Sequence, residues 1–89
     1  MSDLKATFES SIDELKKLTA RPDDETLLEL YSYFKQATEG DVSGDRPGPF
    51  DFKGRAKFDA WADRKGMSRE VAMKGYVKLV NHLKGKDKS

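Results

Sequence analysis

The spacing of apolar residues constrains the fold of this chain more than any other feature, because it has the period of an α-helix throughout. Between residues 4 and 18 apolar side chains recur every three or four positions, which places them on one face of a helix. Similar stripes occupy residues 27–37, 56–62 and 71–83. No stretch has the alternating pattern of a half-buried strand. The sequence therefore predicts an all-α fold of four helices.

The first two helices have recognisable ends. Ser2 or Asp3 is expected to cap the first helix. The acidic run at residues 23–25 follows Pro22 and suits the positive end of a helix, so the second helix is expected to begin there. Gly40 is expected to end it.

The second half of the chain holds a long loop and two further helices. Residues 40–50 (GDVSGDRPGPF) contain three glycines and two prolines, so no regular element is expected there. A short third helix is predicted from about Lys53 to Lys65, before Gly66. Ser68 is expected to cap the fourth helix. The last five residues, 85–89, are expected to fray.

Length and residue types limit the class of protein. A chain of 89 residues suffices for one domain, so residues 1–89 are predicted to form a single domain. Cysteine is missing from the sequence, which excludes disulfides and thiolate metal sites and indicates a reducing compartment. Because no apolar run exceeds three residues, we expect a cytoplasmic protein without stable membrane insertion.

Catalytic chemistry has little support in the residues. His82 is the only histidine, and neither a nucleophile nor metal-ligand spacing surrounds it. Glycine-rich phosphate loops are not found. We therefore predict a binding protein and not an enzyme, with no metal and no cofactor.

Charge is divided unevenly along the chain. Residues 1–45 hold 5 Lys and Arg against 11 Asp and Glu, whereas residues 46–89 hold 12 against 5. Acidic and basic helices could complement each other within one bundle, or the basic half could form a patch that binds a polyanion.

Two of the helices place lysines where a phosphorylated ligand could use them. In the first helix, Phe8, Ile12 and Lys16 follow one another at i to i+4 spacing, so one face changes from apolar to cationic over about 12 Å. In the third, Lys53 and Lys57 are one turn apart, and their ammonium groups can converge on one phosphate.

The second helix repeats the apolar-to-cationic order. Leu28, Tyr31 and Lys35 are spaced by three and four residues, and Phe34 adjoins the lysine. Taken singly, such stripes also suit ordinary core packing with solvated lysines. Together they favour an amphiphilic ligand with a phosphorylated head.

Two long segments, YSYFKQATEGD and RPGPFDFKGRAKFDAWADRKGMSREVAMKGYV, resemble the acyl-CoA-binding protein family. Its members carry Tyr-x-x-Tyr-Lys-Gln-Ala-Thr-x-Gly-Asp and Asp-Phe-x-Gly-Lys/Arg-Ala-Lys-Trp-x-Ala-Trp, and the resemblance extends from Phe8 to Leu83. It implies a monomeric, up-down-down-up four-helix bundle that holds long-chain acyl-CoA in a surface bowl, without cofactor or catalysis. Enzymes that produce or consume acyl-CoA would be its partners, and it would act as an intracellular carrier.

The resemblance also implies roles for particular residues. Those expected to grip the 3′-phosphate are Tyr31, Lys35 and Lys57. Tyr76 is expected to pack against the adenine and ribose. Those expected to contact the nucleotide or pyrophosphate are Lys16 and Lys53. Those expected to line the acyl-chain and pantetheine side are Phe8, Ile12, Leu28 and Phe34.

Several positions depart from the family pattern or lie outside its site. Phe34 stands where tyrosine is common, so a hydroxyl hydrogen bond worth about 0.5 to 1.5 kcal/mol is lost. Phe58 replaces a frequent tryptophan, which leaves Trp61, expected in the core, as the only indole. Gly75 costs about 1 kcal/mol relative to alanine and is expected to loosen the fourth helix. Tyr33 is expected to point away from the ligand.

Two alternatives remain open on the residues themselves. The basic half with its interleaved aromatics could form a helical module that binds nucleic acid, although the overall charge of +1 argues against a nucleic-acid partner. A helical bundle that binds a protein partner is the other alternative.

Overall fold

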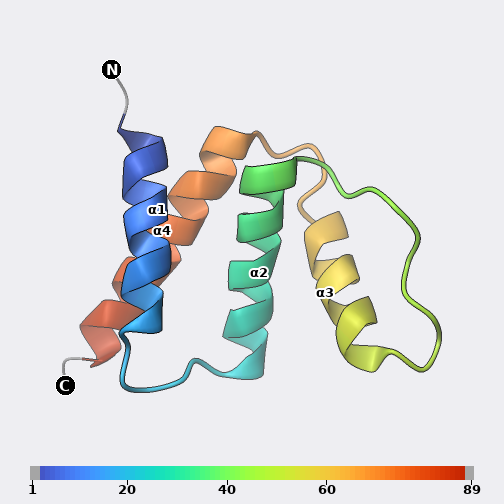
Figure 1. The fold of residues 1–89 in the computed structure, drawn as a ribbon, viewed down its shortest axis with the longest axis horizontal. Coiled ribbons are helices and arrows are strands. Elements are labelled where there is room, and N and C mark those ends of the chain that lie inside the picture. The colour runs from blue at the N-terminus through green and yellow to red at the C-terminus, as the bar shows by residue number, and fades with distance from the viewer. Residues whose placement is uncertain (1–2, 88–89) are drawn as a thin grey trace.

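The computed structural model of the protein describes residues 3–87, which form four α-helices and contain no strand. The helices are α1 (Leu4–Lys16), α2 (Asp24–Glu39), α3 (Phe52–Ala62) and α4 (Arg69–Asp87). In Figure 1, α1 and α4 run in one direction and α2 and α3 in the other, which is the predicted up-down-down-up arrangement. A long loop descends from the end of α2 to the start of α3. The all-α prediction is confirmed.

Helix α4 joins α1 to α2. It packs against both α1 and α2, and α2 also packs against α3. Within residues 3–87 the backbones of α1 and α2 stay apart, and the two helices meet through the side chains of Phe8 and Phe34. The molecule is consequently flat, with extents of 39 × 33 × 16 Å, and α4 crosses behind α1 (Figure 1). The buried apolar core joins α1, α2 and α4 and consists of Phe8, Leu30, Ala37, Ala72, Tyr76 and Val80.

Hydrogen-bonding side chains start α2 and α4 near the predicted places. The Asp23 carboxylate accepts the backbone N–H of Thr26 at 2.8 Å, and this hydrogen bond lowers the pKa of Asp23. The Ser68 hydroxyl accepts the N–H of Val71 at 3.1 Å. At the far end of α2, Gly40 has a φ of 83°, the left-handed conformation that favours glycine.

Other predicted ends differ from the structure. Asp3 occupies the N-cap position of α1 without a side-chain hydrogen bond, and Ser2 lies outside the described residues. Helix α3 ends at Ala62, before the predicted Lys65. The N–H of Lys65 bonds to the Ala62 carbonyl at 3.1 Å, three residues back, so the chain tightens into turns that Gly66 closes.

The C-terminal end of α4 also corrects the prediction. Fraying was expected over residues 85–89, yet α4 continues through Asp87, and residues 88–89 lie outside the described part of the chain. Lys84 and Lys86 in its last turn interact favourably with the negative end of the helix, and Lys84 forms an ion pair with Glu14 of α1 at 3.1 Å.

At the other end of α4, Val71, expected on the apolar face, is 52% exposed.

The Lys84–Glu14 ion pair also tests whether the acidic and basic halves of the chain neutralise each other within the bundle. Among the described residues, only the Lys84–Glu14 pair joins a side chain of the acidic half to one of the basic half. Ion pairs within the bundle thus explain little of the uneven division of charge between the two halves of the chain.

Among residues 3–87, the structure contains no helix with the length and apolar character of a membrane span.

Candidate functional site

Three aromatic rings from three helices meet between α1 and α2. The ring of Phe8 lies 5.1 Å from that of Tyr76, edge to face, and 6.2 Å from that of Phe34. Phe34 and Tyr76 are 6.4 Å apart. Phe8 and Tyr76 are buried, and burial raises the pKa of the Tyr76 phenol. The two buried rings support the half-buried Phe34 from below.

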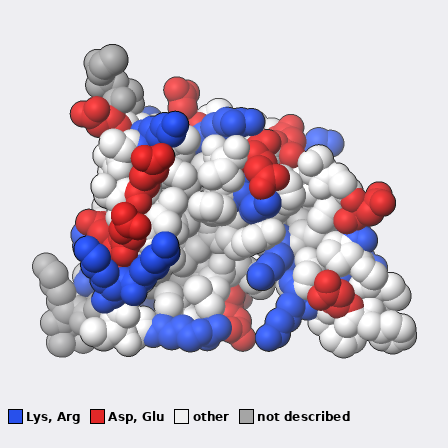
Figure 2. All heavy atoms as spheres, viewed as in Figure 1, with Lys and Arg blue, Asp and Glu red and all other residues white. Residues whose placement is uncertain are grey.

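A hollow without charged side chains lies between α1 and α2 (Figure 2), and we call it the α1–α2 recess. It exists because α1 and α2 both pack on α4 while their own backbones stay apart. Figure 2 shows uncharged side chains across this part of the face, with both basic and acidic side chains at its margins. Ile12 of α1 and Phe34 of α2 are half-buried and pack against the core from either side. The recess thus offers a surface without charged groups, and the apolar side chains of Ile12 and Phe34 lie on its two sides.

Beside the recess, α2 and α3 bring together the residues of a second feature, the α2–α3 seam, which consists of Tyr31, Lys35, Lys57 and Trp61. The ammonium nitrogen of Lys57 lies 5.4 Å from the centre of the Tyr31 ring. That of Lys35 lies 4.8 Å from the centre of the Trp61 ring. Both distances allow cation–π attraction. The predicted trio of Tyr31, Lys35 and Lys57 is therefore brought to one seam.

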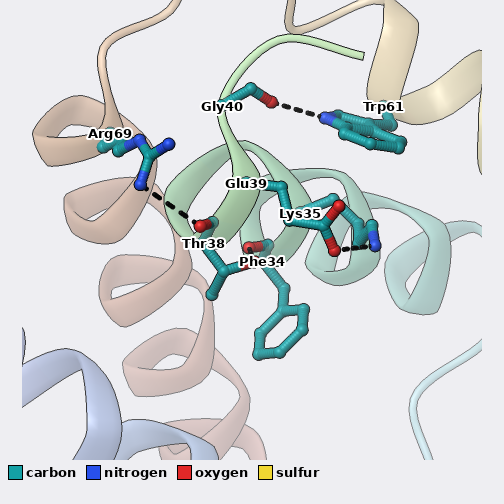
Figure 3. A network of polar contacts seen from close by, with 7 residues as sticks. All are labelled: Phe34, Lys35, Thr38, Glu39, Gly40, Trp61 and Arg69. Carbon is teal, nitrogen blue, oxygen red and sulfur yellow. Dashed lines mark hydrogen bonds and ion pairs between the residues drawn. The ribbon is translucent and has the colours of Figure 1, made fainter. Parts of the chain in front are cut away.

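The two lysines of the seam differ in their partners. Lys35 forms an ion pair with Glu39, one turn further along α2 (Figure 3), and its side chain is only 20% exposed. No ion pair joins Lys57 to another described residue, and its side chain is exposed. An incoming anion would meet a free ammonium at Lys57 but would have to displace a carboxylate at Lys35.

The remaining predicted residues lie around these two features. Leu28 is half-buried and lies seven residues before Lys35, on the same face of α2. Lys53 is exposed in the first turn of α3, one turn from Lys57, and Lys16 is exposed at the last position of α1. The structure thus groups Lys53 with the seam. Leu28 lies on α2, the helix that the recess and the seam share, whereas Lys16 stands apart at the end of α1.

A polar network that the sequence reasoning missed fixes the C-terminal turn of α2. The fully buried Gln36 donates from Nε2 to the Asp41 carboxylate and to the Met67 carbonyl, both at 2.8 Å. Asp41 also accepts the N–H of Gly66 at 2.9 Å, and these two hydrogen bonds, that of Gly66 first, lower its pKa. The turn that carries Lys35 is thereby tied to the α3–α4 connection. In the sequence, the one hint of this network is that a glutamine, Gln36, lies within the apolar face of α2.

Two further side chains anchor the same turn (Figure 3). The indole N–H of Trp61 donates to the Gly40 carbonyl at 2.8 Å, and the guanidinium of Arg69 donates to the Thr38 carbonyl at 3.3 Å. Trp61 is buried, as expected of a core residue. Carbonyls at a helix end lack partners within the helix, so these donors satisfy groups that would otherwise need water.

The opposite side of α2 explains Gly75. A Cβ at Gly75 would lie 2.4 Å from Cε1 of Tyr33, so only glycine lets this ring rest on α4. The guanidinium of Arg64 covers the ring at 4.1 Å from its centre. Tyr33 therefore packs away from the seam, in agreement with the prediction. Helix α4 is continuous through Gly75.

Two cavities lie elsewhere on the protein. One, of about 300 Å³, opens between α1 and α4 and is lined by Ala6, Thr7, Ser10, Ser11, Glu14, Val77, Asn81 and Lys84. The other, of about 290 Å³, lies by the α1–α2 connection and includes Leu18, Arg21 and Leu83. Neither is lined by any of the ten predicted ligand residues. No group of three potential metal ligands is found within the part of the chain that the structure describes.

Comparisons with known proteins identify the family. The family model described as acyl CoA binding protein matches residues 5–80. The acyl-CoA-binding protein of Brassica napus is 49% identical over 80 residues, 90% of this chain and 87% of the relative, and acyl-CoA-binding protein homolog 1 of Caenorhabditis elegans is 44% identical over 77 residues, 86% of this chain and 90% of the relative. The crystal structure of Oryza sativa acyl-CoA-binding protein 2 superposes with a TM-score of 0.92 at 38% identity, covering 97% of this chain and 94% of that one. These matches give no support to a nucleic-acid-binding or protein-binding module. The chain belongs to the acyl-CoA-binding protein family.

Proposed function

We propose that this protein binds long-chain fatty acyl-CoA thioesters and carries them between the enzymes that produce and consume them, without catalysis and without a cofactor. The observation that carries this proposal is the seam of Tyr31, Lys35 and Lys57 directly beside an uncharged recess, in a member of this family. An amphiphile with a phosphorylated nucleotide at one end matches both surfaces at once.

The nucleotide end belongs at the seam. Lys57, Lys35 and Tyr31 would hold the 3′-phosphate. The expected contact of Tyr76 with the adenine and ribose would require this buried ring to become accessible. Lysine suits this task because its three donors can follow a phosphate without the fixed geometry of a guanidinium. Lys53, one turn from Lys57, would reach the pyrophosphate, and Lys16 would approach it from α1.

The acyl end belongs along the recess. Ile12, Leu28 and Phe34, with Phe8 beneath them, would cover the chain and the pantetheine. Each CH₂ removed from water contributes about 0.8 kcal/mol, so a long chain supplies much of the affinity. The phosphate contacts supply recognition, because a fatty acid without the nucleotide would leave the lysines unused.

Binding at the seam requires an exchange of partners. Lys35 has to leave Glu39 before its ammonium can meet a phosphate, whereas Lys57 only has to move from the Tyr31 ring. Glu39 therefore lowers the affinity of the site.

The remaining parts of the proposal concern the setting. Residues 1–89 act as one acyl-CoA-binding domain, as a monomer, in the cytoplasm. The missing cysteines support a reducing compartment.

Isothermal titration calorimetry of the delipidated protein against palmitoyl-CoA, free CoA and palmitate tests the proposal. We expect one-to-one binding of palmitoyl-CoA that is far tighter than binding of either fragment, because only the whole ligand reaches both recess and seam. Palmitoyl-CoA binding no tighter than palmitate would show that the seam does not recognise the nucleotide. A lack of saturable binding would reject the function.

A further inference from the structure

Two phenylalanines are far more exposed than any other large apolar side chain of the described residues. Phe50 is 89% exposed and Phe52 is 75% exposed, whereas Val71 follows at 52%. They flank Asp51 where the long loop meets α3, at a corner of the flat molecule remote from α1 and α4 (Figure 1). Burying one such ring is worth about 1.5 to 3 kcal/mol, so an exposed pair at a projecting corner indicates a binding surface. We call it the Phe50–Phe52 corner.

The surroundings of the corner are basic. Residues 45–57 carry four basic and two acidic side chains. Asp51 caps α3 by accepting the Gly54 N–H at 3.0 Å, and Arg46 is held by Asp59 at 2.7 Å. Lys53 follows Phe52 directly, is exposed and forms no ion pair with another described residue. The partner should therefore combine an apolar interior with a negative surface.

The size of the corner distinguishes between a protein and a bilayer. Two phenylalanines can bury about 300 to 500 Å² together, which is well below the roughly 800 Å² that each partner contributes to a stable protein interface. A bilayer demands no shape complementarity: rings enter the boundary between headgroups and acyl chains, and nearby lysines meet anionic headgroups. We propose that the Phe50–Phe52 corner docks this protein reversibly on anionic lipid bilayers.

Docking at this corner would also serve the proposed function, on which this one step rests. Long-chain acyl-CoA is an amphiphile that partitions into bilayers. Lys53 adjoins Phe52 and lies one turn from Lys57, so a docked protein holds the seam near the lipid surface. Ligand could then pass between bilayer and recess without crossing open water.

Vesicle flotation without acyl-CoA tests docking independently of ligand binding. The wild-type protein should float with vesicles of phosphatidylcholine and phosphatidylserine, and less with phosphatidylcholine alone or in about 0.5 M NaCl, which screens the lysines. The double variant Phe50→Ser, Phe52→Ser should partition at least about tenfold less. Val71→Ser, which removes an exposed apolar side chain from α4, is the matched control and should float as the wild type does.

Two further readings complete the test. In Phe50→Trp, vesicles with brominated acyl chains should quench the new indole, while wild-type fluorescence from the buried Trp61 stays unquenched. The double variant should keep its circular dichroism and its calorimetric affinity for palmitoyl-CoA. A wild type that does not float, or a double variant that floats equally well, overturns the proposal. Loss of palmitoyl-CoA binding in the double variant also overturns it, because the rings would then belong to the ligand site.

Discussion

Helix α2 presents aromatic side chains on two faces, and the two faces are built differently. Toward α4, Tyr33 lies on Gly75 with no room for a single added carbon and is covered by Arg64. Toward α3, Tyr31 lies under an exposed Lys57. Both faces pair a ring with a cation, yet one is closely packed and the other can exchange its cation for a ligand. A ring paired with a cation thus serves packing on the side of α2 that faces α4 and, in our proposal, ligand recognition on the side that faces α3.

The largest effect is expected on the face of α2 that is turned toward α3. Replacing Lys57 by Ala should weaken palmitoyl-CoA binding about tenfold to a hundredfold, because a charge-assisted bond to phosphate is worth about 1.5 to 3 kcal/mol. The free energy of unfolding should change little, since the side chain is exposed. Calorimetry and urea denaturation measure the two quantities. Lys78→Ala, two residues from Tyr76 and hence on the opposite face of α4, should leave affinity unchanged; an equal loss there would indicate only nonspecific charge attraction.

On the face of α2 turned toward α4, a substitution should change the stability of the protein. Gly75→Ala should lower the free energy of unfolding by about 1 to 2 kcal/mol, because the clash with Tyr33 outweighs the better helix propensity of alanine. Gly85→Ala is the control, since it lies in the same helix with nothing within 4 Å, and should stabilise the protein by up to about 1 kcal/mol. A stabilised Gly75→Ala variant in urea denaturation would mean that the ring does not pack on α4 as described.

The counterion of Lys35 offers a smaller effect of opposite sign. Glu39→Gln should tighten palmitoyl-CoA binding by a few fold, about 0.5 to 1 kcal/mol, because the ammonium no longer has to leave a carboxylate. The gain should vanish in the Lys35→Ala background, which calorimetry on the double variant can establish. A gain that persists there would assign the effect to net charge alone.

The smallest effect concerns the anchor of the C-terminal turn. The folded-state pKa of Asp41 is lowered by its hydrogen bonds to Gly66 and Gln36, so its contribution to stability is present above its unfolded pKa, near 3.8. That contribution is lost as the pH falls through the lower folded value. Asp41→Asn should flatten thermal stability against pH below about pH 4, whereas Asp45→Asn in the same loop should not. Equal flattening by both variants would contradict this account.

Local patterns in the sequence were sufficient for the helices and for several of their ends. Helical spacing predicts all four helices, and Gly40 and Ser68 have the conformation and the hydrogen bond expected of them. Helix α3 ends early because the N–H groups of Arg64, Lys65 and Met67 bond to carbonyls three residues back, a choice that helix propensity alone does not reveal. The exposure of Val71 depends on which helices pack beside it.

The candidate site was predictable in its members but not in its geometry. The lysines and rings follow from spacing and resemblance, and the structure brings Tyr31, Lys35 and Lys57 together. Contacts between residues far apart in sequence could not be foreseen: Gln36 bonds to Met67, and Tyr33 packs on Gly75. The sequence also does not show that Glu39 forms an ion pair with Lys35.

The central claim is that ligand binds across the recess and the seam. Backbone amide shifts from ¹⁵N nuclear magnetic resonance, recorded with and without palmitoyl-CoA, test it most directly. We predict large shift changes at Ile12, Phe34 and Lys57 and little change at Ser10 and Asn81, which line the cavity between α1 and α4. Large changes at Ser10 and Asn81 with none at Lys57 would place the ligand in that cavity and contradict the account.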